Sequence, residues 1–415
     1  MQIKALGALS ERNFRWYWLS GLGTTGAQGI QQLGVAWLVL DITGSVGQLG
    51  LVIFLQGVPM TGVAMIGGVL ADRYSRRRLV EFSQVVIASN LLILAVLTLT
   101  NTVLIWQVYA SSLIAGAMLS VTAPARAALV RSVISDRRLS QGIALNAMQQ
   151  QASRIVWPTL TGGLIAVVGV APALILAASA SCWGVLAMTL VRGINEGQQP
   201  TGKSPFGDAI TGFRHIWRTP RLRGLESISL VAGSFGLAFQ AIVPGFARQV
   251  LDFSASETGL LLMVSGVASL FGSLSMVIFA MGDRMRHIAL GYGGFVLAVL
   301  LIAINPFDSG VFILMAAFGV NMGLVSVAGQ TLLQRNTPPE LLGRVVSVWN
   351  SAGGIGFLIA LPLGVVGEAY GLRWALGGGA AIVLAWVSYR AFIFGFPPYS
   401  DTTAAESRPR PVEAS

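Results

Sequence analysis

Three polar side chains recur every four residues inside an apolar stretch in the first half of the chain. They are Asn146, Gln150 and Arg154, with Gln149 and Ser153 beside them. Residues four apart share one face of a helix, so these groups are expected to point the same way. A cation within a membrane span costs about 2.5–3.5 kcal/mol, which predicts a polar cavity for Arg154 and a role in substrate binding or gating. The alternative is that Arg154 ties two helices together by donating to a backbone carbonyl.

Uncharged polar residues in other apolar segments are candidates for the same cavity. Each residue alone is more often a helix–helix contact, because a single interhelical hydrogen bond contributes about 0.6 kcal/mol. The candidates are Gln28, Gln31 and Gln32 in the first half and Gln240, Asn321 and Asn350 in the second. Together they predict an amphipathic cavity for a lipophilic ligand with hydrogen-bonding groups.

The residues needed for enzymatic or metal chemistry are scarce. The chain has two histidines and one cysteine, and it lacks a P-loop and the spacings typical of a catalytic triad or metal site. We therefore expect no enzyme activity, no metal and no cofactor. Glu226 is the most inward carboxylate and the first candidate for carrying a proton, with Asp41 as the second. The alternative for Glu226 is a helix cap or an ion pair with Arg223.

The composition indicates that these residues are positioned by membrane-spanning helices. Apolar residues make up 54% of the 415 residues and charged residues 11%, whereas soluble domains are about 25% charged. A helix needs ~20 apolar residues to cross a bilayer. Twelve such segments occur, at about 16–39, 47–71, 79–100, 103–125, 141–168, 171–192, 224–247, 258–281, 288–305, 310–333, 345–367 and 373–395. The predicted fold class is an all-α membrane protein with twelve transmembrane helices.

The positive charges predict the orientation of these helices. Of the 27 lysines and arginines, all but Arg154, Arg248 and Arg373 fall on one side of the predicted membrane. Short cytoplasmic loops carry the excess of such residues, so both termini are expected in the cytoplasm. Clustering in these loops also explains the net charge of +10 without nucleic-acid binding.

The chain divides into two similar halves. Gly50 and Gly57 match Gly259 and Gly266 at a constant offset, and further pairs agree between the two halves. Two six-helix units in the same orientation form a parallel repeat, an arrangement found in transporters that expose a site alternately to each side. The predicted units are a bundle over 1–192, a linker over 193–222 with a short amphipathic helix on the inner leaflet, a bundle over 223–395 and a disordered tail over 396–415. The alternative for the linker is a flexible tether without membrane contact.

The most specific motif follows the second predicted helix. The sequence from Gly68 through Asp72 and Arg73 to Arg76 and Arg77 resembles the G-x-L-A-D-R-x-G-R-R signature of the major facilitator superfamily, with Ser75 replacing the second glycine. The resemblance extends over about residues 10–395 and is greatest to the drug/proton antiporter branch that includes the enterobactin exporter. It implies a conformational latch on the cytoplasmic side. The latch residues would be Gly68, Asp72, Arg73, Arg76 and Arg77, with Asp283, Arg284, Gly343 and Arg344 in the second half. The alternative is a loop that only fixes orientation.

A second motif follows the polar face of the fifth predicted helix. Pro158, Gly162 and Gly163 lie in a stretch that is similar to the G-P-x-x-G-G element of antiporters, with Trp157 replacing the first glycine. Proline removes a backbone donor and bends a helix, and glycine permits close packing.

The resemblance implies a monomeric transporter of the bacterial inner membrane that exports a small amphipathic organic compound by alternating access, with protons as the coupling ion. Two alternatives remain. One is a flippase for lipids or lysophospholipids in which Arg154 holds a phosphate. The other is a membrane sensor that keeps the fold and binds a ligand without transporting it.

Overall fold

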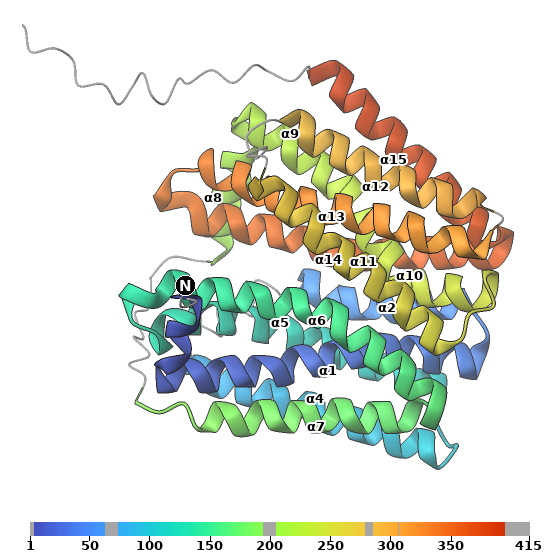
Figure 1. Cartoon of the computed structure of the whole chain (residues 1–415), viewed down its shortest axis with the longest axis horizontal. Coiled ribbons are helices and arrows are strands. Elements are labelled where there is room, and N and C mark those ends of the chain that lie inside the picture. Colours follow the sequence, from blue (N-terminus) through green and yellow to red (C-terminus); the bar gives the residue numbers. More distant parts are fainter. Residues whose placement is uncertain (1–3, 63–73, 194–204, 279–284, 306, 395–415) are drawn as a thin grey trace, which may run out of the picture.

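A computed structural model describes residues 4–62, 74–193, 205–278, 285–305 and 307–394. Within these ranges every element is helical (Figure 1). The first half contains η1 (Lys4–Ser10), α1 (Arg12–Thr43), α2 (Val46–Gly62), α4 (Arg76–Leu99), α5 (Ile105–Val133), η2 (Asp136–Arg138), α6 (Leu139–Val168) and α7 (Val170–Thr189). The predicted all-α membrane fold is confirmed.

The second half repeats this arrangement after the linker helix α8 (Pro205–Arg218). Its first span is continuous through α9 (Pro220–Ile228), a π-helical turn η3 (Ser229–Gly233) and α10 (Ser234–Val250). The remaining helices are α11 (Ala255–Ile278), α12 (Met285–Ile304), α13 (Asp308–Arg335), α14 (Pro339–Tyr370) and α15 (Leu372–Phe394). Each of the twelve predicted segments therefore overlaps a helix within the described residues.

The helices differ in how well they suit contact with lipid. Among the described residues, eight helices are long and apolar enough to span a membrane, and α2 and the Gly354–Tyr370 part of α14 are shorter apolar helices. Neither group includes α1 or α6, which carry the polar candidates. The hydropathy of α1 and α6 is therefore lower than that of the other spans, and such helices are expected to turn a polar face away from lipid.

The two halves lie one above the other in Figure 1, with α1, α4, α5, α6 and α7 below and α12, α13 and α15 above. Contacts between them are made by α2 with α14 and by α6 with α11, and less extensively by α1 with α10. These helices surround the junction of the halves, where a central site would lie.

We call the two ends of the bundle the basic end and the opposite end. At the basic end α1 and α6 begin and α5 and α7 end. Exposed arginines are concentrated there: Arg12, Arg15, Arg131, Arg137 and Arg192. At the opposite end the helices are joined by short connections at Gly44, Gly169 and Gly371, all with positive φ. A glycine adopts this backbone conformation without the steric penalty of a side chain.

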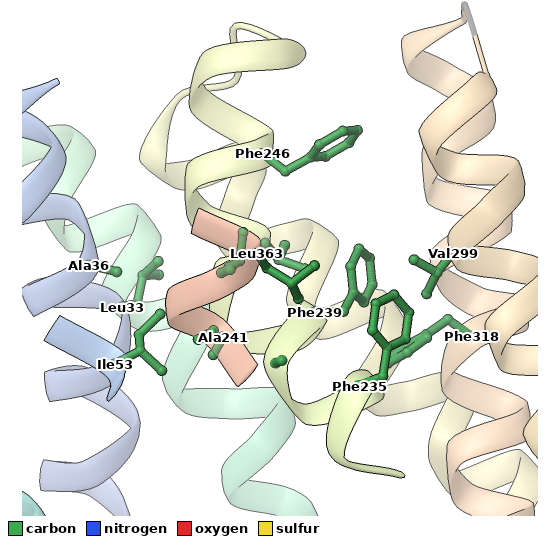
Figure 2. Packing of buried hydrophobic residues seen from close by; sticks show 14 of the residues in the cluster. Leu33, Ala36, Ile53, Phe235, Phe239, Ala241, Phe246, Val299, Phe318 and Leu363 are labelled. Atoms are coloured by element: carbon green, nitrogen blue, oxygen red, sulfur yellow. The ribbon is translucent and has the colours of Figure 1, made fainter. Parts of the chain in front are cut away.

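Apolar packing continues across the junction of the halves. Figure 2 shows Leu33 and Ile53 of the first half facing Ala241 on α10. On the other side of α10, Phe239 packs edge-on against Phe318 with the ring centroids 5.1 Å apart. One helix thus joins the aromatic core of the second half to the first half.

One predicted helix boundary is wrong. The fourth segment was expected to end near residue 125, with Arg126 and Arg131 in the following connection, but α5 continues to Val133. Arg126 lies inside the bundle, where polar groups of α1 surround it. Hydropathy alone ends the helix at the first arginine because it takes no account of partners on another helix.

Candidate functional site

Hydrogen bonds from two side chains of α6 fix one side of this helix against α1. Ser153 Oγ donates to Thr25 Oγ1 at 2.8 Å, and Gln149 Nε2 donates to the backbone carbonyl of Trp18 at 2.8 Å. Both donors are at positions that sequence analysis assigned to the polar face. Part of that face therefore holds α6 to α1.

A different side of α6 packs on α11 in the second half. Gly162 lies so close to Ala255 that a side chain at 162 would collide with the carbonyl oxygen of Ala255. Successive residues of an α-helix are rotated by ~100°. Gln150 and Arg154 consequently lie between the direction of Ser153, which faces α1, and that of Gly162. They face the gap between α1 and α11, at the junction of the two halves.

Exposure along this face of α6 changes from one end to the other. Thr161 is buried, whereas Arg154 and Gln150 are exposed and Ile143, nearer the basic end, is 55% exposed. All four point in similar directions around the helix. The face is therefore closed toward the opposite end and open toward the basic end.

Arg154 makes no hydrogen bond or ion pair with any described residue, although it is midway along a 30-residue helix. The tie to a carbonyl on another helix, which was the alternative for this residue, does not occur in the described part of the chain. The backbone around Arg154 does contact α11: a side chain at Gly266 would lie 3.2 Å from the Arg154 carbonyl oxygen. Pro158 has no N–H to donate to that oxygen.

The three amides of α1 line one cavity. It has a volume of about 160 Å³ and lies where α1, α2, α4 and α5 meet α10 and α14. Its polar lining comes from Gln28, Gln31, Gln32, Gln56 and Ser112. Its apolar lining comes from Val35, Ala36, Leu49, Val52, Ile53, Ile87, Ala115, Leu119, Ala241 and Phe357. The cavity is amphipathic, and Gln56 and Ser112 were not among the predicted residues.

The candidates from the second half do not line this cavity. Gln240 is half-buried on α10, next to the lining residue Ala241. Asn321 donates its amide to the carbonyl of Ala317 on its own helix at 2.8 Å, and it lies against Gly294 of α12. Asn350 is part of α14, but its side chain lies outside the described residues. The polar lining of the cavity therefore comes from the first half alone, among the described residues.

Asn146 does not share the position of Gln150 and Arg154. It is half-buried, and its side chain lies beside the hydroxyl group of Tyr17 on α1. Positions four apart drift by ~40° around a helix, so the ends of a three-residue series differ by ~80°. This drift turns Asn146 toward α1 and Arg154 toward the junction of the halves.

Arg126 is a polar residue of the interior that sequence analysis placed in a loop. Its guanidinium lies 4.7 Å from the centre of the Tyr17 ring. It donates to Ser20 Oγ at 3.3 Å, Thr24 Oγ1 at 3.5 Å and the Tyr17 carbonyl at 3.3 Å. These α1 groups hold the Arg126 guanidinium in place, so Arg126 fixes α5 to α1.

Most of the predicted latch falls outside the described residues. This applies to Gly68, Asp72, Arg73, Asp283 and Arg284, and the surroundings of Gly343 and the side chain of Arg344 in α14 are also not described. Arg76 is half-buried at the first position of α4.

Arg77 is hydrogen-bonded within the first half. It donates to Glu81 at 2.8 Å and to the carbonyls of Val191 at 2.6 Å and Thr189 at 3.1 Å. These contacts attach α4 to the end of α7.

An ion pair joins the halves at the opposite end. Arg248 Nη1 on α10 donates to Asp41 Oδ1 on α1 at 2.5 Å, and its guanidinium lies 5.0 Å from the centre of the Trp37 ring. The adjacent Gln249 donates to the carbonyl of Gly44 at 2.5 Å. Asp41 is therefore paired with a cation of the other half.

Glu368 of α14 adds a second contact at the same end. Its Oε2 accepts hydrogen bonds from Ser45 Oγ at 3.0 Å, from the Val46 N–H at 2.9 Å and from the Gly47 N–H at 3.1 Å. A carboxylate at a helix N-terminus accepts hydrogen bonds from the free N–H groups there. Its negative charge also stabilises the helix by interacting with the positive end of the helix dipole. One half thus caps α2 of the other. We call Asp41, Arg248, Gln249 and Glu368 the opposite-end clamp.

Paired glycines bring the halves together just inside the clamp. Gly50 of α2 packs on Gly364 of α14, and Gly259 of α11 packs on Gly162 of α6. Each pair is close enough that a β-carbon on either residue would approach the partner's Cα at 3.0–3.2 Å. The repeat detected in the sequence therefore has a structural counterpart, since Gly50 and Gly259 make equivalent contacts.

Glu226 lies in the second half toward the basic end. It is 8% exposed, and its Oε2 has no hydrogen-bond partner among the described residues. The pair with Arg223, which was the alternative for this carboxylate, is not formed at Oε2. Near it, Tyr292 of α12 donates to Ser229 Oγ in the π-helical turn at 2.8 Å, and Arg390 of α15 donates to Ser227 Oγ at 2.5 Å. π-helical turns are frequent at functional sites.

Two helical bundles with an amphipathic cavity between them are typical of a polytopic membrane transporter. A family model described as Major Facilitator Superfamily matches residues 17–361, and the chain belongs to this family. It is a multi-pass membrane protein and a transporter of small molecules, not an enzyme.

Curated relatives are similar over most of the chain. The enterobactin exporter EntS of Salmonella typhimurium is 28% identical over 353 residues, which cover 84% of each protein. EntS of Escherichia coli O1:K1 is 26% identical over 386 residues, covering 92% of this chain and 88% of the relative.

Solved structures agree in fold. A bacterial homologue of the human lysosomal transporter Spinster, described as inward-facing and unoccupied, has a TM-score of 0.74 at 12% identity and covers 96% of this chain and 98% of its own. The nucleoside transporter NupG has a TM-score of 0.71 at 14% identity, with coverage of 92% and 98%.

Proposed function

We propose that this transporter exports a small amphipathic organic compound, drug- or siderophore-like, by alternating access and in exchange for protons. The observation that carries the proposal is the one-sided opening. The inner face of α6 is exposed from Arg154 to Ile143 and buried at Thr161, and the clamp joins the halves beyond it. The similarity to enterobactin exporters supports the direction of transport.

In this proposal the basic end faces the cytoplasm of a bacterial inner membrane. The excess of arginine at that end supports the orientation, because cytoplasmic loops carry positive charge. Both termini are then cytoplasmic, and the structure corresponds to an inward-open state. A single chain contains both bundles, so we propose that the monomer is the functional unit.

Closing the cytoplasmic end requires a second set of contacts, which we assign to the motif residues. The latch consists of Gly68, Asp72, Arg73, Arg76, Arg77, Asp283, Arg284, Gly343 and Arg344. The substrate cavity consists of Gln28, Gln31, Gln32, Gln150 and Arg154, with Asn146, Gln240, Asn321 and Asn350 at its margins. Pro158 and Gly162 shape α6 where it meets α11, and Gly163 faces open space. Glu226 carries the proton, and Asp41 acts in the clamp.

The clamp gives the first testable consequence. Replacing Glu368 with alanine removes the acceptor of the Val46 and Gly47 N–H groups, while Ser45 Oγ still accepts from the Gln48 N–H at 3.1 Å. Losing such a capping acceptor costs about 1–2 kcal/mol. In a Cys182→Ser background carrying Leu49→Cys, we expect a membrane-impermeant maleimide added from outside to label the cysteine ~5–30-fold faster. Leu49 is fully buried behind the clamp.

Glu257→Ala is the matched control. Glu257 lies at the same end but accepts hydrogen bonds only from Ser254, three residues away, among the described residues. Its replacement should leave the labelling rate unchanged. Equal rates in the Glu368 and Glu257 variants would contradict the role of the clamp.

The function is tested by efflux from cells and proteoliposomes over a panel of drugs and catecholate siderophores, with and without a pH gradient. We expect at least one compound to be exported only when the gradient is present, and Asp72→Asn to reduce that export. Flux that responds to neither the gradient nor the variant would refute the proposed mechanism.

A further inference from the structure

Arg154 is the most unusual group of the junction between the halves, because it is a cation without a described counter-charge. The described carboxylates lie elsewhere. Asp41, Asp252, Glu257 and Glu368 are at the opposite end, Glu11, Glu81 and Asp136 are at the basic end, and Glu226 is buried in α9. An unpaired charge at mid-membrane depth is costly, and proteins usually pair it or place it in a wet cavity.

Neutral hydrogen-bond donors lie at the same depth as Arg154. The hydrogen bond between Ser153 and Thr25 sets the level at which α6 meets α1. Arg154 is the next residue on α6, and Gln28 is within one turn of Thr25 on α1. A ligand held by the guanidinium would thus also reach the amides of Gln28 and Gln150. This set offers one fixed positive charge with donors around it.

Arg126 differs from Arg154 because its guanidinium has hydrogen-bond acceptors within the chain. Three acceptors on α1 and the ring of Tyr17 hold its guanidinium inside the chain. The exposed Arg154 makes no such contacts in the described structure. The contrast indicates that Arg154 is kept available for a partner from outside the chain.

We propose that the transported compound is an amphipathic organic anion, and that Arg154 binds its carboxylate, phosphate or phenolate oxygens while its apolar part contacts Ile53, Ala241 and Phe357. This inference rests on the proposed transport function and names its substrate class. An ionised acceptor forms shorter and stronger hydrogen bonds with a guanidinium than a neutral one. A cationic compound would be repelled at the same position.

The test compares two xanthene dyes of opposite charge, carboxyfluorescein and rhodamine 123, in inside-out membrane vesicles with an imposed pH gradient. We expect the wild-type protein to accumulate carboxyfluorescein in preference to rhodamine 123. Arg154→Gln should raise the half-saturating carboxyfluorescein concentration about tenfold or more, the equivalent of one hydrogen bond to a charged group. Arg154→Lys should restore most of the accumulation, because it restores the charge.

Arg137→Gln is the control for a general loss of positive charge. Arg137 is exposed in η2 at the basic end, away from the cavity, so its replacement should leave carboxyfluorescein accumulation unchanged. Preferential accumulation of rhodamine 123, or equal losses for both dyes in Arg154→Gln, would overturn the anion assignment.

A binding measurement separates this inference from the transport function. Purified full-length protein is heated with carboxyfluorescein or with lysophosphatidylglycerol, and the melting temperature is recorded. A stabilisation that disappears in Arg154→Gln supports an anion site even if no flux occurs, in which case the export proposal alone fails. Stabilisation by the lysolipid only would identify the anion as a lipid headgroup. Stabilisation by neither anion, together with no preference in flux, would refute the site.

Discussion

Gly162→Val is expected to abolish transport, whereas Gly163→Val on the same helix should be tolerated. A side chain at 162 would meet the carbonyl of Ala255 and the Cα of Gly259, and neither backbone atom can move without separating α6 from α11. Forcing extra volume into such a contact costs about 1–3 kcal/mol, enough to shift a two-state equilibrium about 5–150-fold. In the proposed mechanism this shift is away from the inward-open state.

Gly163 provides a close control, because no atom lies within 4 Å of a β-carbon built at this position. Both substitutions introduce the same β-branched residue into the same helix, so differences in helix propensity cancel. The measurement is export by cells that contain equal amounts of each variant in the membrane. Equal activity of the two variants would show that close approach of α6 and α11 is not required.

Glu226→Gln is expected to eliminate the dependence of export on the pH gradient. The Glu226 carboxylate is buried and one of its oxygens lacks a partner among the described residues, so the group could bind and release a proton without breaking an ion pair. Glutamine has a similar shape and does not titrate in the physiological range. We expect exchange of labelled substrate across vesicles to continue while accumulation against a gradient is lost.

Asp41→Asn distinguishes Asp41 from Glu226 as the carboxylate that carries the coupling proton. Asp41 is paired with Arg248 at the opposite end, and both side chains are partly exposed. Exposed pairs contribute at most about 1 kcal/mol, so its neutralisation should change the rate of export less than tenfold and leave the pH dependence intact. Loss of coupling in Asp41→Asn but not in Glu226→Gln would reverse the assignment.

The sequence was sufficient to predict the class of fold because long apolar segments have few alternatives in a membrane. Helices satisfy all of their own backbone hydrogen bonds, so segments of ~20 apolar residues predict spans without any tertiary information. The repeat between the two halves was detectable because its glycines are required for close packing of helices. Gly50 and Gly259 are at positions where only a residue without a side chain permits the contact that each makes.

The clamp could not be predicted because its members are far apart in the chain. Asp41 and Arg248 are separated by 207 positions, and Glu368 is 322 positions from Val46. Each residue alone is an ordinary charged residue near a helix end. Their pairing depends on how the two halves are arranged, which helix periodicity does not specify.

The site was predicted in part. The spacing of Gln150 and Arg154 identified residues that face the junction of the halves, but Asn146 diverges from them because a four-residue spacing drifts around the helix. Arg126 was missed because a buried arginine is recognisable only when its acceptors on another helix are known. Gln56 and Ser112 were missed because single polar residues in apolar helices are common and carry no pattern.

The central claim is that the two halves rock about the cavity, opening one end as the other closes. It is tested most directly by pulsed electron paramagnetic resonance distances between spin labels in a Cys182→Ser background. One pair, Thr102→Cys with Tyr370→Cys, reports on the opposite end, and the other, Arg137→Cys with Gln334→Cys, reports on the basic end; all four positions are exposed. We predict that lowering the pH or adding an exported compound shifts the two distance distributions in opposite directions. Distributions that stay fixed, or that widen together at both ends, would contradict the account.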